Sequence, residues 1–170
     1  MTIFLVGFMG SGKTTVGRRL AGQIGYDFID TDYFIEMQQK LTVAEIFARH
    51  GEADFRDMER NALMELRKCE FAVISTGGSM PCHDGNMDVM LATGKVVYLM
   101  TSPQTLARRL LLSRTDRPLI KGKTEPELQQ YIAEHLAKRE TFYNKANIVV
   151  QTEKYSIEEI LQKLNLMKKT

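Results

Sequence analysis

Short apolar runs alternate with longer helical patterns along this chain, which indicates a parallel α/β fold. Five runs are rich in β-branched or aromatic residues and bounded by polar residues or glycine, as buried strands are: 3–6, 26–29, 71–74, 96–100 and 148–150. Strands that alternate with helices form right-handed units, and helices then cover both faces of a parallel sheet. The pattern predicts a three-layer α/β/α architecture with a five-stranded parallel sheet.

Helical spacing and capping sequences mark the segments between these runs. Capping boxes at Thr42 and Ser156, and Ser102 followed by proline, each predict the start of a helix. The predicted helices are 13–24, 42–49, 52–68, 105–112 with Ser102 and Pro103 ahead of it, 125–143 and one that begins after Ser156. Residues 113–124 are basic, contain Pro118 and Gly122, and lie between two helices. Loops of this length in a compact domain are usually functional, so this segment is predicted to be a mobile lid.

Composition narrows the class of protein. The 170 residues fit one domain, and the 44% hydrophobic content suffices for a full core. A net charge of +2 favours neither nucleic acid nor an anionic membrane as a partner. The apolar run at 3–6 is too short for a signal peptide, and Cys69 and Cys82 have no metal-ligand spacing. We therefore expect a cytoplasmic protein, and a monomer, since no apolar heptad pattern is present.

Residues 7–14 match the phosphate-loop pattern GxxxxGK followed by threonine, between a predicted strand and a predicted helix. The glycines allow backbone N–H groups to turn inward around an anion, and the following helix directs its positive dipole end there. Lys13 adds a full charge for the β- and γ-phosphates, and the Thr14 hydroxyl suits Mg²⁺. A turn without function is the alternative, but this context favours a nucleoside triphosphate site.

Two carboxylates, Asp30 and Asp32, follow the second predicted strand. The carboxyl ends of parallel strands share one edge of the sheet, so these residues are expected beside the phosphate loop. If the strand geometry continues, both side chains point the same way, one to a substrate hydroxyl and the other to the metal. The alternative is that an aspartate here caps a helix.

Arginines and adjacent glycines supply further candidates. Arg56 and Arg139 each offer a planar fork for a carboxylate, and Glu59 could hold Arg56 by a helical pair. The alternative is that these arginines lie on solvated helix faces. Gly77 and Gly78 follow a predicted strand and allow close approach of a ligand to the backbone, although a plain turn has the same sequence.

Together these features resemble the shikimate kinase family, small P-loop kinases related in fold to nucleoside monophosphate kinases. The resemblance covers essentially the whole chain. It rests on residues 7–14, 30–32, Phe55-Arg56 with Glu59, 76–78, Arg117-Pro118-Leu119, and Arg139 with Tyr143. One departure is Ser79, where the family usually has a third glycine.

The resemblance implies that MgATP phosphorylates the 3-hydroxyl of shikimate, giving shikimate 3-phosphate on the route to chorismate and the aromatic amino acids. Catalysis is implied for Lys13, Asp32 and Arg117. ATP binding is implied for Gly10, Ser11, Gly12, Lys13, Thr14, Thr15, Arg109 and Arg117, with Arg108 replacing Arg109 if the register differs by one. Shikimate binding is implied for Asp32, Arg56, Gly77, Gly78, Arg139, Phe47 and Phe55. Thr14 would hold Mg²⁺, with Asp30 and Ser75 reaching it through water.

Within this scheme Asp32 would act as the base or orient the hydroxyl, and Arg109 would lie against adenine. Arg117 would fold over the transferring phosphoryl group. Residues 1–170 would form a single P-loop kinase domain, with the shikimate-binding region at about 32–61 and the lid at about 113–124. The partners would be shikimate and ATP.

Two alternatives remain at this level. Another small-molecule kinase on the same architecture, such as a gluconate or nucleoside monophosphate kinase, would share the phosphate loop. A nucleotide-binding regulatory module would keep the loop but would not require Asp32 or the lid arginine.

Overall fold

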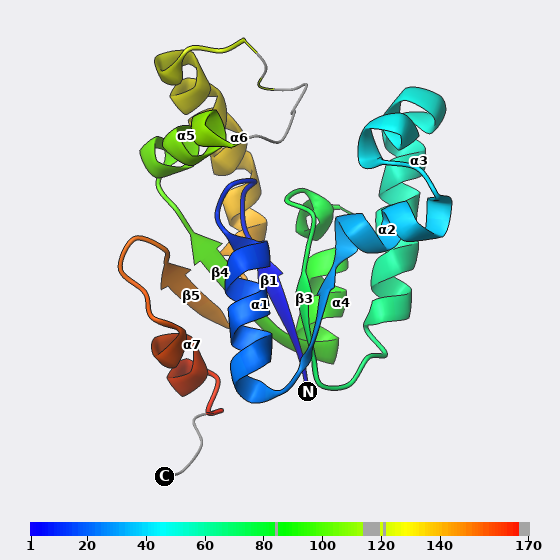
Figure 1. Cartoon of the computed structure of the whole chain (residues 1–170), viewed down its shortest axis with the longest axis vertical. Coiled ribbons are helices and arrows are strands. Elements are labelled where there is room, and N and C mark those ends of the chain that lie inside the picture. Colours follow the sequence, from blue (N-terminus) through cyan, green and yellow to red (C-terminus); the bar gives the residue numbers. More distant parts are fainter. Residues whose placement is uncertain (84, 114–119, 121, 167–170) are drawn as a thin grey trace.

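A computed structural model describes residues 1–83, 85–113, 120 and 122–166. Its centre is a five-stranded sheet in the order β2-β3-β1-β4-β5, in which every neighbouring pair is parallel (Figure 1). The strands are β1 Thr2–Val6, β2 Asp27–Asp30, β3 Ala72–Ser75, β4 Gly94–Met100 and β5 Ile148–Gln151. The predicted α/β fold with five parallel strands is confirmed.

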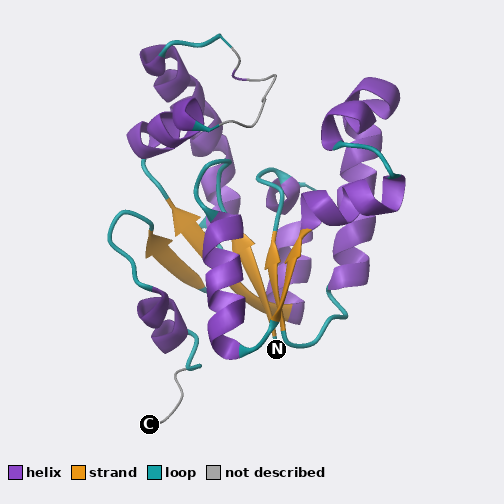
Figure 2. Ribbon diagram, in the orientation of Figure 1, coloured by secondary structure: helices purple, strands orange, loops and turns teal. Residues whose placement is uncertain are grey.

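The central strand β1 divides its side chains between the two faces of the sheet. Ile3 and Leu5 pack against α1 (Lys13–Ile24) and α7 (Ile157–Lys163). Phe4 and Val6 pack on the opposite face. There they meet α4 (Asn86–Thr93), α5 (Pro103–Leu112), α6 (Glu125–Tyr143) and the end of α3 (Val43–Leu66). The result is the predicted three-layer arrangement (Figure 2).

The predicted helix starts are present. The Thr42 side chain caps α3 in a reciprocal capping box with Glu45, and Ser102 caps α5. Ser156 accepts a hydrogen bond from the Glu159 N–H at 3.1 Å and begins α7. Gly51 lies inside α3 with a φ of 81°, so the two helices predicted on either side of it are two parts of one bent element.

One helix contradicts the expected local geometry. The strand ends at Asp30, and α2 (Thr31–Gln39) begins at the next residue. The Asp30 carboxylate accepts a hydrogen bond from the Asp32 N–H at 3.2 Å, because the first N–H groups of a helix need an outside acceptor. The expectation that Asp30 and Asp32 point the same way along a strand is therefore wrong. Helix α4 was also not predicted.

Helices α2 and α3 form an arm with a small core of its own. Ile35, Ile46, Phe55 and Ala62 make this arm core, which is a cluster apart from the two that cover the sheet. Figure 1 shows the α2–α3 arm and the α5–α6 pair on either side of the loop between β1 and α1. The two units therefore flank the carboxyl edge of the sheet.

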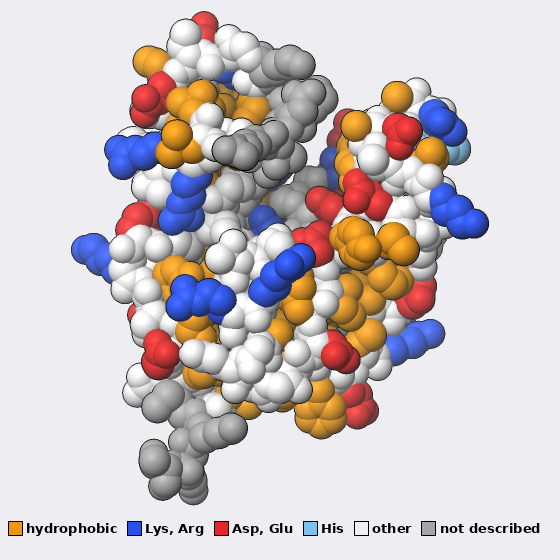
Figure 3. All heavy atoms as spheres, viewed as in Figure 1, with side chains coloured by type: hydrophobic (Ala, Val, Ile, Leu, Met, Phe, Trp, Pro, Cys, Tyr) orange, Lys and Arg blue, Asp and Glu red, His pale blue; other side chains and the backbone are white. Residues whose placement is uncertain are grey.

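The viewed surface carries Lys, Arg, Asp and Glu side chains intermixed, without a large patch of one sign (Figure 3). This distribution agrees with the small net charge of +2. Within the described ranges, no helix has both the length and the apolar content needed to cross a bilayer.

Candidate active site

The loop between β1 and α1 is shaped for an anion. Gly10 and Gly12 have φ values of 83° and 96°, a left-handed backbone that glycine adopts at little cost. Gly12 is also the N-cap of α1, where no side chain caps the helix and no acidic residue occupies the first turn. The N–H groups and the positive dipole end of α1 are therefore open to a negatively charged ligand.

Two side chains of this loop fit a phosphate group. The Lys13 ammonium donates to the carbonyls of Gly7 and Phe8 at 2.8 and 3.0 Å, so it is held against the loop. The Ser11 hydroxyl is buried and has no hydrogen-bond partner among the described residues. A buried hydroxyl without a partner is costly, and a phosphate oxygen would satisfy it.

The oxygen atoms beside Lys13 fit Mg²⁺. The Thr14 hydroxyl donates to the Asp30 carboxylate at 3.0 Å, and Ser75 ends β3 on the same wall. Among the described residues, no group of three or more His, Cys, Asp or Glu could hold a metal. Magnesium often binds through few protein oxygens, with water and substrate phosphates completing its shell, so this donor set suits an ion that arrives with a nucleotide.

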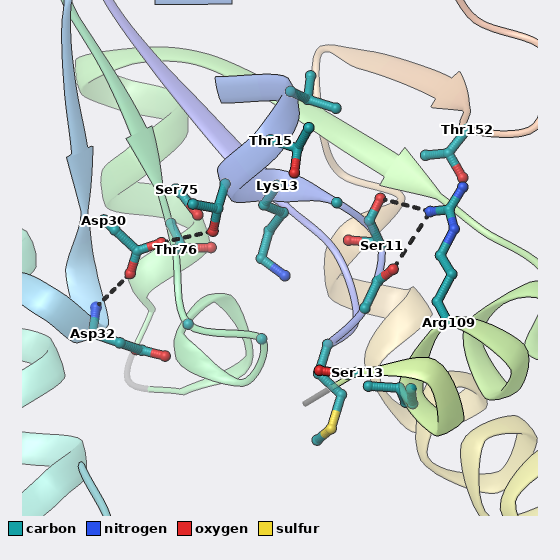
Figure 4. Close-up of a pocket in the computed structure, with 18 of the residues that line it drawn as sticks. Ser11, Lys13, Thr15, Asp30, Asp32, Ser75, Thr76, Arg109, Ser113 and Thr152 are labelled. Atoms are coloured by element: carbon teal, nitrogen blue, oxygen red, sulfur yellow. Dashed lines mark hydrogen bonds between the residues drawn. The ribbon is translucent and has the colours of Figure 1, made fainter. Parts of the chain in front are cut away.

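A cavity of about 510 Å³ joins the phosphate loop to the acceptor candidates. Its wall includes residues 9–16, Asp30, Asp32, Ser75, Thr76, Gly77, Gly78 and Arg109. Figure 4 shows the Lys13 and Asp32 side chains pointing into this space. The volume is in the range of small-molecule sites, and the cavity places a phosphate donor and a carboxylate in one compartment.

Arg109 lies at the end of the cavity opposite Asp32 (Figure 4). Its guanidinium donates to the carbonyls of Gly10 and Ser11 at 3.4 and 3.3 Å. Arg108, the alternative by register, does not line the cavity. The structure therefore favours Arg109, and its contact with adenine stays a prediction.

Thr152 and Tyr155 also line the cavity, Thr152 beside Arg109 (Figure 4), but neither was predicted from the sequence. Thr152 directly follows β5, and its hydroxyl hydrogen bonds with that of Thr101 at 2.6 Å. A usable signal was present, because residues that follow a parallel strand lie at the ligand-binding edge of the sheet.

The pairing expected for Arg56 is present. Its guanidinium donates to Glu59 at 2.5 Å and to Glu52 at 3.0 Å. Glu59 is 1% exposed, whereas Glu52 is exposed. Burial lowers the pKa of Arg56, but the hydrogen bonds and charges of these two carboxylates outweigh burial and raise it. The guanidinium is therefore held in place and fully charged.

Residues 76–79, here called the glycine loop, lie close to this cluster. A Cβ on Gly77 would come within 2.7 Å of Glu59 Oε1 and 2.8 Å of Asp32 Oδ1. A Cβ on Gly78 would lie 3.5 Å from Arg139 Nη1. The Arg139 guanidinium also lies 5.0 Å from the centre of the Phe8 ring. Charged groups from α2, α3 and α6 thus converge on this loop.

The pKa of Glu59 reflects that convergence. Burial raises it from 4.5 to about 7, and Asp32 adds to the rise, while Arg56 and Arg139 oppose it. Two carboxylates next to one another resist ionising together.

Phe47 and Phe55 stack in a tilted pair on α3, with ring centres 4.7 Å apart. Phe55 is 4% exposed and belongs to the arm core, whereas Phe47 is 37% exposed. Neither phenylalanine lines the 510 Å³ cavity, and the same holds for Arg56 and Arg139. Arg117 and most of the predicted lid lie outside the described residues.

A phosphate loop at the carboxyl edge of a parallel sheet, with a carboxylate in the same cavity, places the protein among the P-loop kinases. A family model described as Shikimate kinase matches residues 9–167. The chain belongs to the shikimate kinase family and is a kinase.

Individual relatives support the same family assignment. The chain is 50% identical to a shikimate kinase of Parabacteroides distasonis over 89% of its own length and 88% of that protein. It matches a crystal structure of shikimate kinase from Bacteroides thetaiotaomicron with 42% identity and a TM-score of 0.90, covering 97% and 96% of the two chains. A shikimate kinase from Acinetobacter baumannii, solved in complex with shikimate, matches with 33% identity, a TM-score of 0.85 and coverage of 96% and 90%.

Proposed function

We propose that this protein transfers the γ-phosphoryl group of ATP to the 3-hydroxyl of shikimate, giving shikimate 3-phosphate and ADP. The observation that carries the proposal is the cavity in which the phosphate loop, Asp32 and the glycine loop meet. One shared cavity would allow the two substrates to react directly, because positioning reactants together removes much of the entropic barrier.

The donor end supplies positive charge. Phosphoryl transfer has a loose transition state with charge spread over the equatorial oxygens, so catalysis is mainly positioning and electrostatic stabilisation. Lys13 and the N-terminus of α1 face that charge, and Gly10, Ser11, Gly12 and Thr15 line the same wall. Mg²⁺, when bound by Thr14 and through water by Asp30 and Ser75, would neutralise phosphate charge. Arg117 is proposed to add a further charge from the lid.

The acceptor end orients an acid that carries hydroxyls. Arg56 and Arg139 are proposed to hold the carboxylate of shikimate, since planar forks bind carboxylates in bidentate fashion. Gly77 and Gly78 would contact ring hydroxyls through their backbone, and Phe47 and Phe55 would wall the site.

Asp32 is the better candidate than Glu59 for the reacting hydroxyl. Asp32 lines the cavity, whereas Glu59 does not line it and pairs with Arg56 at 2.5 Å. A carboxylate that receives or orients a hydroxyl proton must come within hydrogen-bond reach of it. Asp30 also lines the cavity, but its carboxylate already accepts hydrogen bonds from the Thr14 hydroxyl and the Asp32 N–H, which leaves Asp32 as the proposed partner of the hydroxyl.

We further propose a cytoplasmic monomer with ATP and shikimate as its partners, acting on neither nucleic acid nor membrane. An enzyme that consumes ATP needs a compartment where ATP is supplied.

A coupled ADP-release assay with Mg²⁺, ATP and a panel of acceptors tests the reaction. We expect shikimate to stimulate ADP release, and Lys13→Ala to abolish the stimulation as the matched control. Stimulation by gluconate or a nucleoside monophosphate, with none by shikimate, would assign a different kinase. ATP binding with no turnover on any acceptor would instead indicate a regulatory module.

A further inference from the structure

Tyr143 lies behind the glycine loop and contacts it directly. The residue is fully buried at the end of α6, and its hydroxyl donates a hydrogen bond to the Gly78 carbonyl. Burial raises the pKa of Tyr143, so the phenol keeps the proton that it donates. Its ring packs against that of Tyr98, with centres 5.0 Å apart, which fixes the position of the phenol.

Two backbone N–H groups of the glycine loop, those of Gly78 and Ser79, donate no hydrogen bond within the described residues. Gly77 N–H donates to the Thr31 hydroxyl at 2.9 Å, and the Gly77 carbonyl accepts from Met80. A peptide unit is planar and trans, so fixing the Gly78 carbonyl also directs the Ser79 N–H away from Tyr143. Ser79 keeps this donor although it carries a side chain.

Tyr143 also ties this loop to an arginine. Arg139 precedes it by four residues, so the two side chains lie on one face of α6. A Cβ on Gly78 would lie 3.5 Å from Arg139 Nη1, and the Tyr143 hydroxyl holds Gly78 from behind. One helix turn thus sets the spacing between a guanidinium and the backbone of the loop.

We propose that Tyr143 is a positioning residue for the acceptor, fixing the Gly78–Ser79 peptide relative to Arg139. This inference rests on the proposed function, because it assumes that Arg139 and the glycine loop hold shikimate. In this role Tyr143 positions the peptide that contacts the substrate and need not touch the substrate itself.

The test compares Tyr143→Phe with Tyr98→Phe. Both changes remove one oxygen from a buried tyrosine of the same ring pair, but the Tyr98 hydroxyl forms no hydrogen bond to the glycine loop. For Tyr143→Phe we expect the KM for shikimate to rise about five- to tenfold, the loss of one hydrogen bond, with the KM for ATP unchanged. For Tyr98→Phe we expect both values to stay at the wild-type level.

The proposal would be overturned if Tyr143→Phe and Tyr98→Phe had the same KM for shikimate. It would also be overturned if Tyr143→Phe raised the KM for shikimate and the KM for ATP alike. Both conclusions hold even if Tyr143→Phe melts at a lower temperature. A second measurement needs no variant. On addition of shikimate to the ¹⁵N-labelled wild-type protein, the amide signals of Gly78 and Ser79 should shift, and unchanged signals would count against the proposal. Failure of the proposed function is distinguishable, because the wild-type enzyme would then show no shikimate-dependent ADP release.

Discussion

Gly77→Ala should damage the acceptor site while sparing the nucleotide site. The added Cβ would lie 2.7 Å from Glu59 Oε1 and 2.8 Å from Asp32 Oδ1. Ordinary contact begins at 3.4 Å, so the carboxylates or the loop must retreat by about 0.6–0.7 Å. Misplacement by about 1 Å can cost a factor of about 10² in rate, so we expect kcat/KM for shikimate to fall 10- to 100-fold.

The assay is steady-state kinetics with each substrate varied in turn, together with a thermal melt. Gly77 has no positive φ, so alanine brings no backbone strain, and the KM for ATP should stay within about twofold. Gly78→Ala is the matched control, because its Cβ would meet no atom closer than 3.4 Å and should have the smaller effect. Near-normal shikimate kinetics for Gly77→Ala, or an equal loss in both variants, would refute this reasoning.

Three further outcomes are expected. Asp32→Asn should lower kcat by about 10²- to 10⁴-fold, the range for groups that move or orient a proton, and near-normal turnover would remove Asp32 from that role. The pKa of Glu59 is about 7 in the folded protein and 4.5 in the ordinary case. Between these two pH values the folded protein keeps a proton that the unfolded chain has released. The free energy of unfolding should therefore fall as the pH rises from 4.5 to about 7. The raised pKa should lower the free energy of unfolding by about 3 kcal/mol across this range. Urea titrations at a series of pH values between 4.5 and 7 measure this decline, and Glu59→Gln should make it less steep. An equally steep decline in the variant would contradict the raised pKa. Gly22→Ala, where a Cβ meets nothing within 4 Å in the last turn of α1, should add about 0.5–1 kcal/mol to the free energy of unfolding with unchanged kinetics, and a destabilised variant would count against it.

Most of the fold could be predicted from the sequence because its signals are local. The phosphate loop ends a strand and begins a helix within a few residues, and α1 and α6 have the bounds that their apolar spacing and flanking residues predict. Helices α2 and α4 were not predicted. In α2, the pair Asp30 and Asp32 suits both a strand end and a helix cap, and only the hydrogen bond to Asp30 decides between them. In α4, apolar residues such as Met87, Val89, Met90 and Leu91 follow no single face.

The site was predictable in kind but not in geometry. A motif can suggest that Arg56 binds an acid and that Asp32 binds a hydroxyl. The burial of Glu59 and the approach of Gly77 to two carboxylates depend on tertiary packing, which the motif does not give. Nothing in the local sequence relates Tyr143 to Gly78, which are 65 positions apart. Thr152 could have been predicted from its place directly after β5, whereas nothing in the local sequence marks Tyr155 as a cavity residue.

The arm core has a consequence for how this enzyme can change. Ile35, Ile46, Phe55 and Ala62 pack together rather than into either layer of the sheet, so the α2–α3 arm is held by contacts that the phosphate loop largely does not share. Units packed in this way can open with a free energy of their own, below that of global unfolding. Substitutions within the arm core should therefore shift the positions of Asp32 and Arg56 at little cost to the packing around the phosphate loop.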